Sequence, residues 1–244
     1  MAASHTWLHP LLSGELTRRD AAIAELMDDP ACDRAALDAT YAQFGIINTV
    51  VSGWRSTYRR LIRPLLSTTL PTRLLDIGSG GGDLAVQLAA WARRDGLRLH
   101  VVAADPDPRA DAFARSRGAQ TGVEFRRALS SDLVAEGERF DLVVSNHLLH
   151  HLDAAALGAL LSDSERLAPR AVHADITRSA LAYAGFGILT APFFHGSFIR
   201  ADGLTSIRRS HRPEELAPYL PGQWRVRAAS PFRYLLTRGG FGDG

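Results

Sequence analysis

Three glycines alternate with other residues directly after an apolar run, in the stretch LLDIGSGGGDLAVQLA. Gly78, Gly80 and Gly82 lack a Cβ atom, so a ligand can approach the main chain where it turns from a strand into a helix. A dinucleotide site requires the spacing G-x-G-x-x-G, and Asp83 stands where its third glycine would lie. The carboxylate of Asp76 would repel a pyrophosphate but suits an ammonium group. The spacing therefore predicts a ligand with an amino group and no pyrophosphate.

A second acid, Asp105, ends the run HVVAAD about twenty residues after the glycines. A carboxylate at this place can accept hydrogen bonds from both vicinal hydroxyls of a ribose. The structural alternatives are a tight turn for the glycines and a helix N-cap before Pro106 for the acid. Because Asp76, the spaced glycines and Asp105 follow one another in the order of a nucleoside site, the binding interpretation is favoured.

Three histidines follow another apolar run, in the segment FDLVVSNHLLHHLD. If a helical turn begins at Asn146, His147, His150 and His151 fall at positions i, i+3 and i+4 and lie on one side. Histidine, with an unperturbed pKa of about 6.5, can take a proton from a phenol, whose pKa is about 10. We predict His150 as a general base, His151 as the second choice and His147 as an orienting group. Purely structural roles are the alternative.

The same histidines raise the possibility of a metal site, because His147 and His151 have the helical spacing of paired ligands. No H-E-x-x-H pattern occurs, and Asp153 is the sole nearby acid, without a familiar ligand spacing. The sequence therefore predicts no metal ion.

Strand-sized apolar runs alternate with helical patterns after residue 71: RLLDIG, RLHVVAAD, VEFRRA, FDLVVSN and AVHADIT. Helices are expected between them at residues 83–94, 109–117 and 154–167. This alternation predicts a mainly parallel sheet covered on both faces. The runs QWRVRAA and FRYLLTR, linked through Ser230 and Pro231, predict an antiparallel terminal pair. We expect an α/β fold with a three-layer, doubly wound sheet of seven strands.

From about Ser13 to Leu66, apolar residues recur at three- and four-residue intervals, which predicts two or three helices within residues 1–70. We expect them to form an N-terminal helical cap on a main domain of residues 71–244. An aromatic stripe in this cap favours core packing over a lining for an aromatic substrate. Its members are Tyr41, Phe44, Asn48, Trp54 and Tyr58.

Residues 178–220 depart from simple alternation, being rich first in aromatics and glycine and then in arginine and histidine. They predict a helix, a mobile loop and another helix, inserted over the active site as a lid. An ordinary packed helix with a solvated loop is the alternative. Within this insert, His195 and His211 compete for the role of base.

Composition narrows the class of protein. The 244 residues are 46% hydrophobic, enough for one core with an appendage, and the net charge of +2 comes with no basic block for nucleic acid. Cys32 is the only cysteine, which excludes an internal disulfide and is typical of a reducing compartment. With no signal-peptide pattern and no long apolar run, we expect a cytoplasmic protein without membrane insertion. The oligomeric state stays open, a homodimer included.

The stretches LLDIGSGGGDLAVQLA, VVAADPDPRA and FDLVVSNHLLHHLD together resemble the class I S-adenosylmethionine-dependent methyltransferases, in particular the branch that acts on small molecules. The likeness covers residues 74–177. It implies that Asp76 and the glycine loop meet the methionine part of S-adenosyl-L-methionine and that Asp105 holds the ribose.

The resemblance also implies a polar or acidic residue beside the adenine, after the third strand. Here the segment RRALSSDL places Leu129 or Ser130 at that position, with Asp132 as a substitute. Asn146, at the end of the fourth strand, joins the expected cofactor-binding residues.

The expected activity is O- or C-methylation of a small aromatic acceptor, phenolic or quinol-like, including one derived from a polyketide in secondary metabolism, with a histidine base. One alternative is N- or C-methylation of a non-phenolic metabolite. Another is a cofactor-binding protein without transferase activity. An RNA methyltransferase is disfavoured because no N-P-P-Y-like segment follows the fourth strand.

Overall fold

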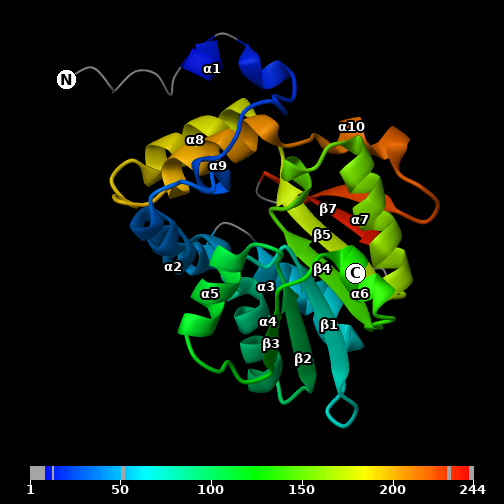
Figure 1. Cartoon of the computed structure of the whole chain (residues 1–244). Coiled ribbons are helices and arrows are strands. Elements are labelled where there is room, and N and C mark those ends of the chain that lie inside the picture. Colours follow the sequence, from blue (N-terminus) through cyan, green and yellow to red (C-terminus); the bar gives the residue numbers. More distant parts are fainter. Residues whose placement is uncertain (1–8, 13, 51–52, 230–231, 242–244) are drawn as a thin grey trace.

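The apolar runs form one seven-stranded sheet (Figure 1). The computed structural model describes residues 9–12, 14–50, 53–229 and 232–241, without the side chains of residues 12 and 46–50. The strands are β1 (Thr72–Ile77), β2 (Leu99–Ala104), β3 (Val123–Arg126), β4 (Leu142–Asn146), β5 (Ala171–Ile176), β6 (Arg225–Ala229) and β7 (Arg233–Arg238). Their order across the sheet is β3-β2-β1-β4-β5-β7-β6.

Strands β1 to β5 run parallel, whereas β7 pairs antiparallel with both β5 and β6. The predicted sheet with its antiparallel terminal pair is therefore confirmed. Central strands β1 and β4 carry continuous apolar runs, Leu74–Leu75 and Leu142–Val144, because both faces of the sheet are covered, and Leu74 and Val143 are fully buried. The link through Ser230 and Pro231 lies outside the described residues.

The helices fall between the strands as the alternation predicts. The α-helices are α1 (His9–Leu12), α2 (Arg34–Val50), α3 (Trp54–Thr57), α4 (Asp83–Arg94), α5 (Pro108–Ser116), α6 (Ser130–Ala135), α7 (Ala154–Leu167), α8 (Ala180–Thr190), α9 (Ile199–Arg209) and α10 (Pro213–Leu216). Single turns of 3₁₀ helix are η2 (Glu15–Thr17), η3 (Leu26–Asp28), η5 (Arg63–Leu65), η6 (Leu149–His151) and η7 (Ala217–Tyr219), and η4 (Tyr58–Ile62) is a π-helix.

Local sequence sets several helix boundaries. Helix α7 begins where the Asp153 side chain accepts a hydrogen bond from the Ala156 N–H at 2.8 Å. Helix α5 begins with Pro108, after the capping side chain of Asp107. These capping residues stand next to the helices that they begin, so the sequence locates the helix ends well. Helices α4 and α7 have the predicted bounds, and α5 is shifted by a single residue.

Two hydrophobic cores cover the two faces of the sheet. On one face, Leu84 and Leu88 of α4 pack with Trp54 and Ile62 from the segment before β1. On the other face, helices α6 and α7 supply the buried side chains Leu133, Leu157, Leu160 and Leu161. Each fully buried side chain of this size contributes about 1.5–3 kcal/mol. These cores give the three layers of the fold.

The N-terminal helices divide between two environments. Trp54 and Tyr58 are buried in the core of the sheet, where the Tyr58 ring lies 5.5 Å from that of Trp91. Tyr41 and Leu37 of α2 are buried in a separate cluster, where they pack with Ala110 of α5. These aromatic side chains therefore have core positions, as favoured, whereas the Asn48 side chain lies outside the described residues. The boundary of the cap at residue 70 stays a prediction.

The insert folds as a helical layer beyond one end of the strands. Helix α8 packs against α9, and α9 contacts both η3 of the N-terminal segment and η6 after β4 (Figure 1). Buried Arg178 binds the backbone oxygens of Leu16 and Ser210, which joins the N-terminal segment to the insert. Among the described residues, no helix is both long and apolar enough to span a membrane.

Candidate active site

The glycine loop follows β1 at the point where the strand order reverses. Strand β1 pairs with β2 on one side and with β4 on the other, which makes the crevice beyond its carboxyl end the expected ligand position. Gly78, Gly80 and Gly82 have φ angles of 66°, 53° and 74°. These left-handed conformations are unfavourable for residues with a Cβ atom, so the backbone of this loop depends on glycine.

Space also restricts two of these glycines. A Cβ atom on Gly82 would lie 2.3 Å from Cε1 of Phe125, and one on Gly78 would lie 3.0 Å from Cδ1 of Leu148. Leu148 belongs to the turn after β4 that carries the histidines. The glycine loop therefore touches the histidine-bearing turn directly.

Asp105 lies against the glycine loop, as predicted for a nucleoside site. Its carboxylate accepts hydrogen bonds from the Gly80 N–H at 2.8 Å and from the Asp107 N–H at 2.9 Å. Burial raises the pKa of Asp105, although these two N–H groups oppose the shift. The acid after β2 and the loop after β1 thus form one continuous surface.

Asp76 is a buried acid without a complete set of partners. Its side chain is 1% exposed, and within the described part of the chain its Oδ2 atom has no hydrogen-bond partner. Burial, followed by the charges of Asp83 and Asp105, raises its pKa well above the ordinary value. An orphaned buried carboxylate oxygen beside a glycine loop fits an ammonium group, such as that of the methionine part of the cofactor.

The predicted adenine residues have other partners in this structure. The Ser130 hydroxyl donates to Asp163 at 2.7 Å, which joins α6 to α7. The Asp132 carboxylate accepts from the Leu129 N–H at 2.9 Å and caps α6. Leu129 itself is 52% exposed. The adenine contact, like the role of Asn146 at the end of β4, stays a prediction.

The turn after β4 differs from the helical turn we expected. Only Leu149–His151 forms a single turn of 3₁₀ helix, and His147 precedes it with a left-handed φ of 55°. The expectation of one helix was wrong because Asp175, on the adjacent strand β5, accepts the His150 N–H at 2.8 Å and holds the turn. The histidines are still gathered, but by carboxylates and not by helical spacing.

His150 is enclosed by two carboxylates. Its Nδ1 lies 2.8 Å from Oδ1 of Asp175 and its Nε2 lies 3.2 Å from Oε1 of Glu25, with the side chain 1% exposed. Burial alone would lower the pKa of His150, but these carboxylates outweigh it and raise the pKa to about 9. Burial would raise the pKa of Asp175, and the neighbouring His150 and His147 hold it well below its ordinary value instead. No ring nitrogen of His150 faces open space in this arrangement.

The side chains of His147 and His151 are more exposed than that of His150. Nδ1 of His147 is 3.8 Å from Asp175, and Nδ1 of His151 is 3.4 Å from Asp28, each side chain being 26% exposed. Nε2 of His151 also faces Glu25 at 3.8 Å. The three predicted histidines therefore meet three acids in one histidine–carboxylate cluster.

Sequence reasoning missed the acids of this cluster. Asp175 was open to detection, because it lies near the carboxyl end of β5 as Asp105 lies just after β2, and β5 is next to β4. Glu25 carries no such signal, since it precedes His150 by 125 residues in a short irregular segment.

The competing histidines of the insert differ in their surroundings. His195 is exposed in the loop between α8 and α9. His211 is partly buried, and burial together with Arg19 lowers its pKa to about 4. Its Nε2 atom has no hydrogen-bond partner within the described chain. A ring with so low a pKa is a weak base at neutral pH.

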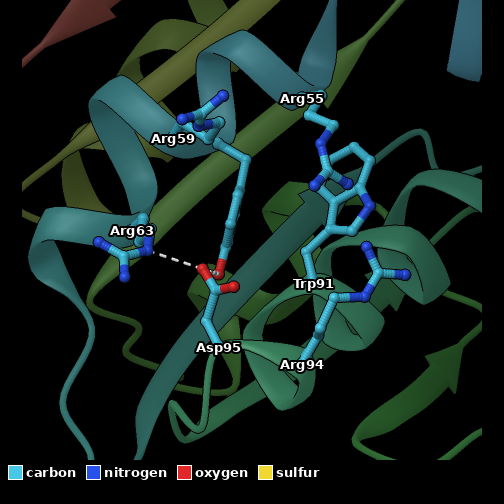
Figure 2. Close-up of a pocket in the computed structure, with 7 residues that line it drawn as sticks. Arg55, Arg59, Arg63, Trp91, Arg94 and Asp95 are labelled. Atoms are coloured by element: carbon cyan, nitrogen blue, oxygen red, sulfur yellow. Dashed lines mark hydrogen bonds and ion pairs between the residues drawn. The ribbon is translucent and has the colours of Figure 1, made fainter.

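A separate cavity of about 540 Å³ lies at the C-terminal end of α4, where Trp91, Arg94 and Asp95 line it (Figure 2). Arginines from α3 to η5 and from α4 surround it, and Arg63 pairs with Asp95 at 2.6 Å. Its lining consists of Arg55, Tyr58, Arg59, Arg63, Trp91, Arg94 and Asp95. Because the cavity and Gly82 are at opposite ends of α4, the cavity is not part of the glycine loop site.

Comparison with known proteins identifies the family of the chain. Residues 74–171 match the family model described as a methyltransferase domain. A ubiquinone biosynthesis O-methyltransferase of Methylobacterium sp. is 32% identical over 185 residues, which are 67% of this chain and 71% of that protein. The chain belongs to the class I S-adenosylmethionine-dependent methyltransferases.

Other relatives of this methyltransferase match over shorter stretches. A ubiquinone biosynthesis O-methyltransferase of Cereibacter sphaeroides is 39% identical over 109 residues. That match covers 43% of this chain and 41% of the relative, so it spans less than half the length of either.

Solved structures share the fold. Human N-acetylserotonin methyltransferase in complex with S-adenosylmethionine superimposes with a TM-score of 0.61 at 13% identity, over 98% of this methyltransferase and 68% of the human chain. An O-methyltransferase family protein from Burkholderia thailandensis gives a TM-score of 0.61 at 17% identity, over 98% and 71% of the two chains. At these identities the likeness concerns the fold, and it confirms the predicted fold class.

Proposed function

We propose that this methyltransferase transfers the methyl group of S-adenosylmethionine to an oxygen atom of a small phenolic or quinol-like acceptor. One observation carries the cofactor part: the Gly80 N–H and the Asp105 carboxylate lie 2.8 Å apart at the reversal point of the sheet, next to the orphaned Oδ2 of Asp76. The acceptor part is supported by relatives named ubiquinone biosynthesis O-methyltransferases.

The chain's own residues divide the cofactor between them. In this proposal Asp76 receives the ammonium group, the backbone of Gly78 to Gly82 admits the methionine portion, and Asp105 accepts from the ribose hydroxyls. The cofactor supplies an electrophilic methyl group on a sulfonium. Since the glycine loop touches Leu148, the methyl group would face the turn that carries the histidines.

Methyl transfer is an in-line displacement, so alignment and exclusion of water are the main tasks of the protein. The C–S bond of the methyl group breaks as the C–O bond to the acceptor forms, and the hydroxyl proton must leave. In this proposal the proton passes to the histidine–carboxylate cluster, with His150 as the first receiving group, His151 as the second and His147 as an orienter. Because the raised pKa leaves the His150 ring protonated at neutral pH, its Nε2 can receive the hydroxyl proton only after its own proton has passed to the facing Glu25.

Helices α8 and α9 with their connecting loop are proposed as the cover of the acceptor. Their loop exposes Phe193 at 61%, and α8 exposes Leu181, Ile188 and Leu189. An apolar surface of this kind suits an aromatic ligand better than a charged one.

The test is transfer from methyl-labelled S-adenosylmethionine to catechols and quinols, to aromatic amines, and to activated ring carbons. We expect methylated oxygen in the first group, identified by product mass and methyl position. Methylation of amines alone would replace the proposed acceptor class. Cofactor binding without turnover on any acceptor would favour a binding protein and contradict the proposal.

A further inference from the structure

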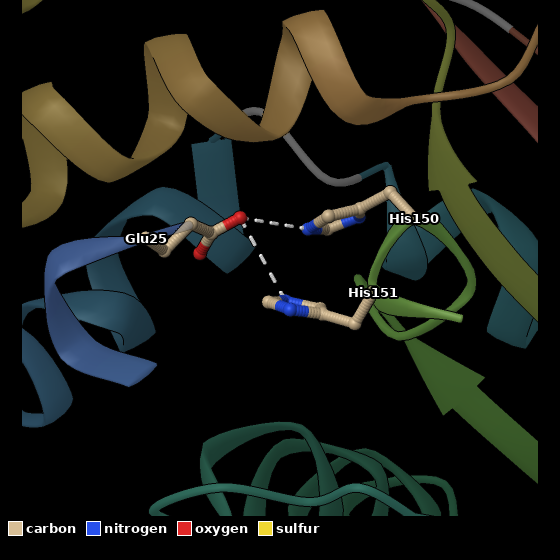
Figure 3. A group of neighbouring side chains, drawn as sticks. All are labelled: Glu25, His150 and His151. Carbon is tan, nitrogen blue, oxygen red and sulfur yellow. Dashed lines mark hydrogen bonds and ion pairs between the residues drawn. The ribbon is translucent and has the colours of Figure 1, made fainter. Parts of the chain in front are cut away.

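Two neighbouring histidines and one glutamate converge from distant parts of the sequence (Figure 3). Glu25 lies in the N-terminal segment, and His150 and His151 end the turn after β4. Oε1 of Glu25 is 3.2 Å from Nε2 of His150 and 3.8 Å from Nε2 of His151, and one ligand atom from each residue lies within 4.8 Å of the others. Zinc bonds of about 2.1 Å hold neighbouring donors roughly 3 to 3.5 Å apart. Only small side-chain shifts separate this group from a coordination site.

The outer nitrogen of each histidine already has a carboxylate partner. Nδ1 of His150 lies 2.8 Å from Asp175, and Nδ1 of His151 lies 3.4 Å from Asp28. In metal sites a coordinating histidine characteristically donates its second N–H to such a carboxylate, which fixes the ring and leaves the other nitrogen unprotonated for the metal. Carboxylates at both outer nitrogens therefore leave Nε2 of each ring as the atom that a metal ion would share with Glu25, in place of the proton that His150 carries there.

Further contacts hold the three donors in place. The Ser206 hydroxyl donates to Oε1 of Glu25 at 2.7 Å. Arg19 donates to the backbone oxygens of His150 and Leu152 at 2.9 and 2.8 Å, which secures the turn against the N-terminal segment. Glu25 and His150 are buried, whereas His151 is partly open. The group is thus rigid on one side and accessible on the other.

We propose that Glu25, His150 and His151 bind one divalent transition-metal ion. Two imidazole nitrogens and one carboxylate oxygen suit zinc, cobalt, nickel or ferrous iron and not magnesium, which prefers oxygen ligands and retains its waters. Three protein ligands leave a coordination position for a water or ligand oxygen. Sequence analysis considered a metal ion only at His147 and His151, and Glu25 was not detected because 125 residues separate it from His150.

Metal and proton are alternative occupants of the same nitrogens. When a metal ion is bound, His150 and His151 no longer receive a proton from an acceptor. The proposal concerns metal binding alone and does not depend on methyl transfer, so it is tested without cofactor or acceptor.

The experiment uses the full chain without an affinity tag, treated with a chelator and then titrated with Co²⁺. We expect one Co²⁺ per chain by calorimetry, visible absorption bands of low-coordinate cobalt, displacement by Zn²⁺ and no competition from Mg²⁺. His151→Gln and Glu25→Gln should each weaken Co²⁺ binding at least tenfold or so. His195→Gln is the matched control, because this exposed histidine lies outside the cluster, and it should bind as the unaltered chain does.

Two results would overturn the proposal: no saturable binding near one equivalent, or binding by the folded His151→Gln variant as tight as that of the unaltered chain. Either would mean that a proton alone occupies the cluster. Because the His151 side chain is partly exposed, we expect His151→Gln to fold, and circular dichroism checks this. If Glu25→Gln does not fold, Co²⁺ binding by His151→Gln alone tests the proposal.

Discussion

The glycine loop and the histidine–carboxylate cluster lie at the same edge of the sheet but differ in construction. The loop is made of backbone, and residues 78–82 carry all its special conformations. The cluster is made of side chains from the N-terminal segment, the turn after β4 and strand β5. A local backbone site can be inferred from a short motif, whereas a cluster closed by long-range contacts needs the folded chain.

The two regions should also fail differently. Changes in the glycine loop and Asp105 should lower affinity for S-adenosylmethionine, and changes in the cluster should lower stability with less effect on that affinity. Four substitutions separate these outcomes.

The largest effect is expected from Asp175→Asn. This change leaves the buried His150 with only one carboxylate, and breaking such a pair costs about 3–5 kcal/mol of the free energy of unfolding. Urea denaturation of the variant and of the unaltered chain measures this loss of unfolding free energy. The control Asp153→Asn keeps the N-cap of α7 and should change stability little. If Asp175→Asn is as stable as the control, the cluster is not a structural unit.

Next comes Gly82→Ala, with Gly118→Ala as the control. Both glycines have a φ of 74°, so both variants pay a similar strain of about 1–2 kcal/mol. The Gly82 variant adds a clash with Phe125, whereas nothing lies within 4 Å of a Cβ atom at Gly118. We expect a total loss of about 2–4 kcal/mol and weaker cofactor binding for Gly82→Ala alone. Equal losses of unfolding free energy in the two variants would show that Phe125 moves aside and that the clash at Gly82 costs nothing.

Asp105→Asn should act mainly on the cofactor. Loss of a charged acceptor from two ribose hydrogen bonds is expected to weaken S-adenosylmethionine binding by about 10- to 100-fold, or about 1.4–2.8 kcal/mol. Calorimetry compares it with Glu124→Gln, an exposed acid on β3. Unchanged affinity in Asp105→Asn would remove the ribose assignment.

The last effect depends on pH and concerns His173, a buried histidine two residues before Asp175. Its ring bonds to the Ser145 and Ser164 hydroxyls, and burial without a carboxylate lowers its pKa to about 3. Because the unfolded chain binds this proton and the folded chain does not, stability should fall as pH drops below about 6.5, by up to about 1.4 kcal/mol per pH unit.

His173→Asn should flatten this slope of the unfolding free energy between pH 6 and pH 4. The comparison with the cluster is direct: one buried histidine in β5 has hydroxyl partners, and His150 beside the same strand has carboxylates. A slope that is the same in the variant and in the unaltered chain would contradict the assignment.

The sequence predicted those parts of the fold that depend on neighbouring residues, such as helix caps and strand ends. Helix α7 is fixed by its cap Asp153, and the strand at Asp105 ends where the apolar run ends. The glycine loop and Asp105 were expected in one site because both follow strands of a mainly parallel sheet, and β1 and β2 are parallel neighbours. These inferences needed only neighbouring residues and the rule that ligands lie at strand ends.

Tertiary contacts decided the rest. The turn after β4 departs from helical spacing because Asp175 captures the His150 N–H. Ser130 and Asp132, expected near the adenine, have partners in α7 and in the cap of α6. Glu25 meets its histidines only through packing of the N-terminal segment on α9, which no periodicity records.

The attachment of the N-terminal segment has a consequence for synthesis on the ribosome. Arg19 and Glu25 emerge early, but they bind the turn at His150, the α9 residue Ser206 and the backbone of Arg209, which are translated much later. Domains generally fold as units during translation, N-terminal parts first. Here the opening segment has to wait unpaired until most of the polypeptide has left the exit tunnel, so the histidine–carboxylate cluster is among the last features to assemble.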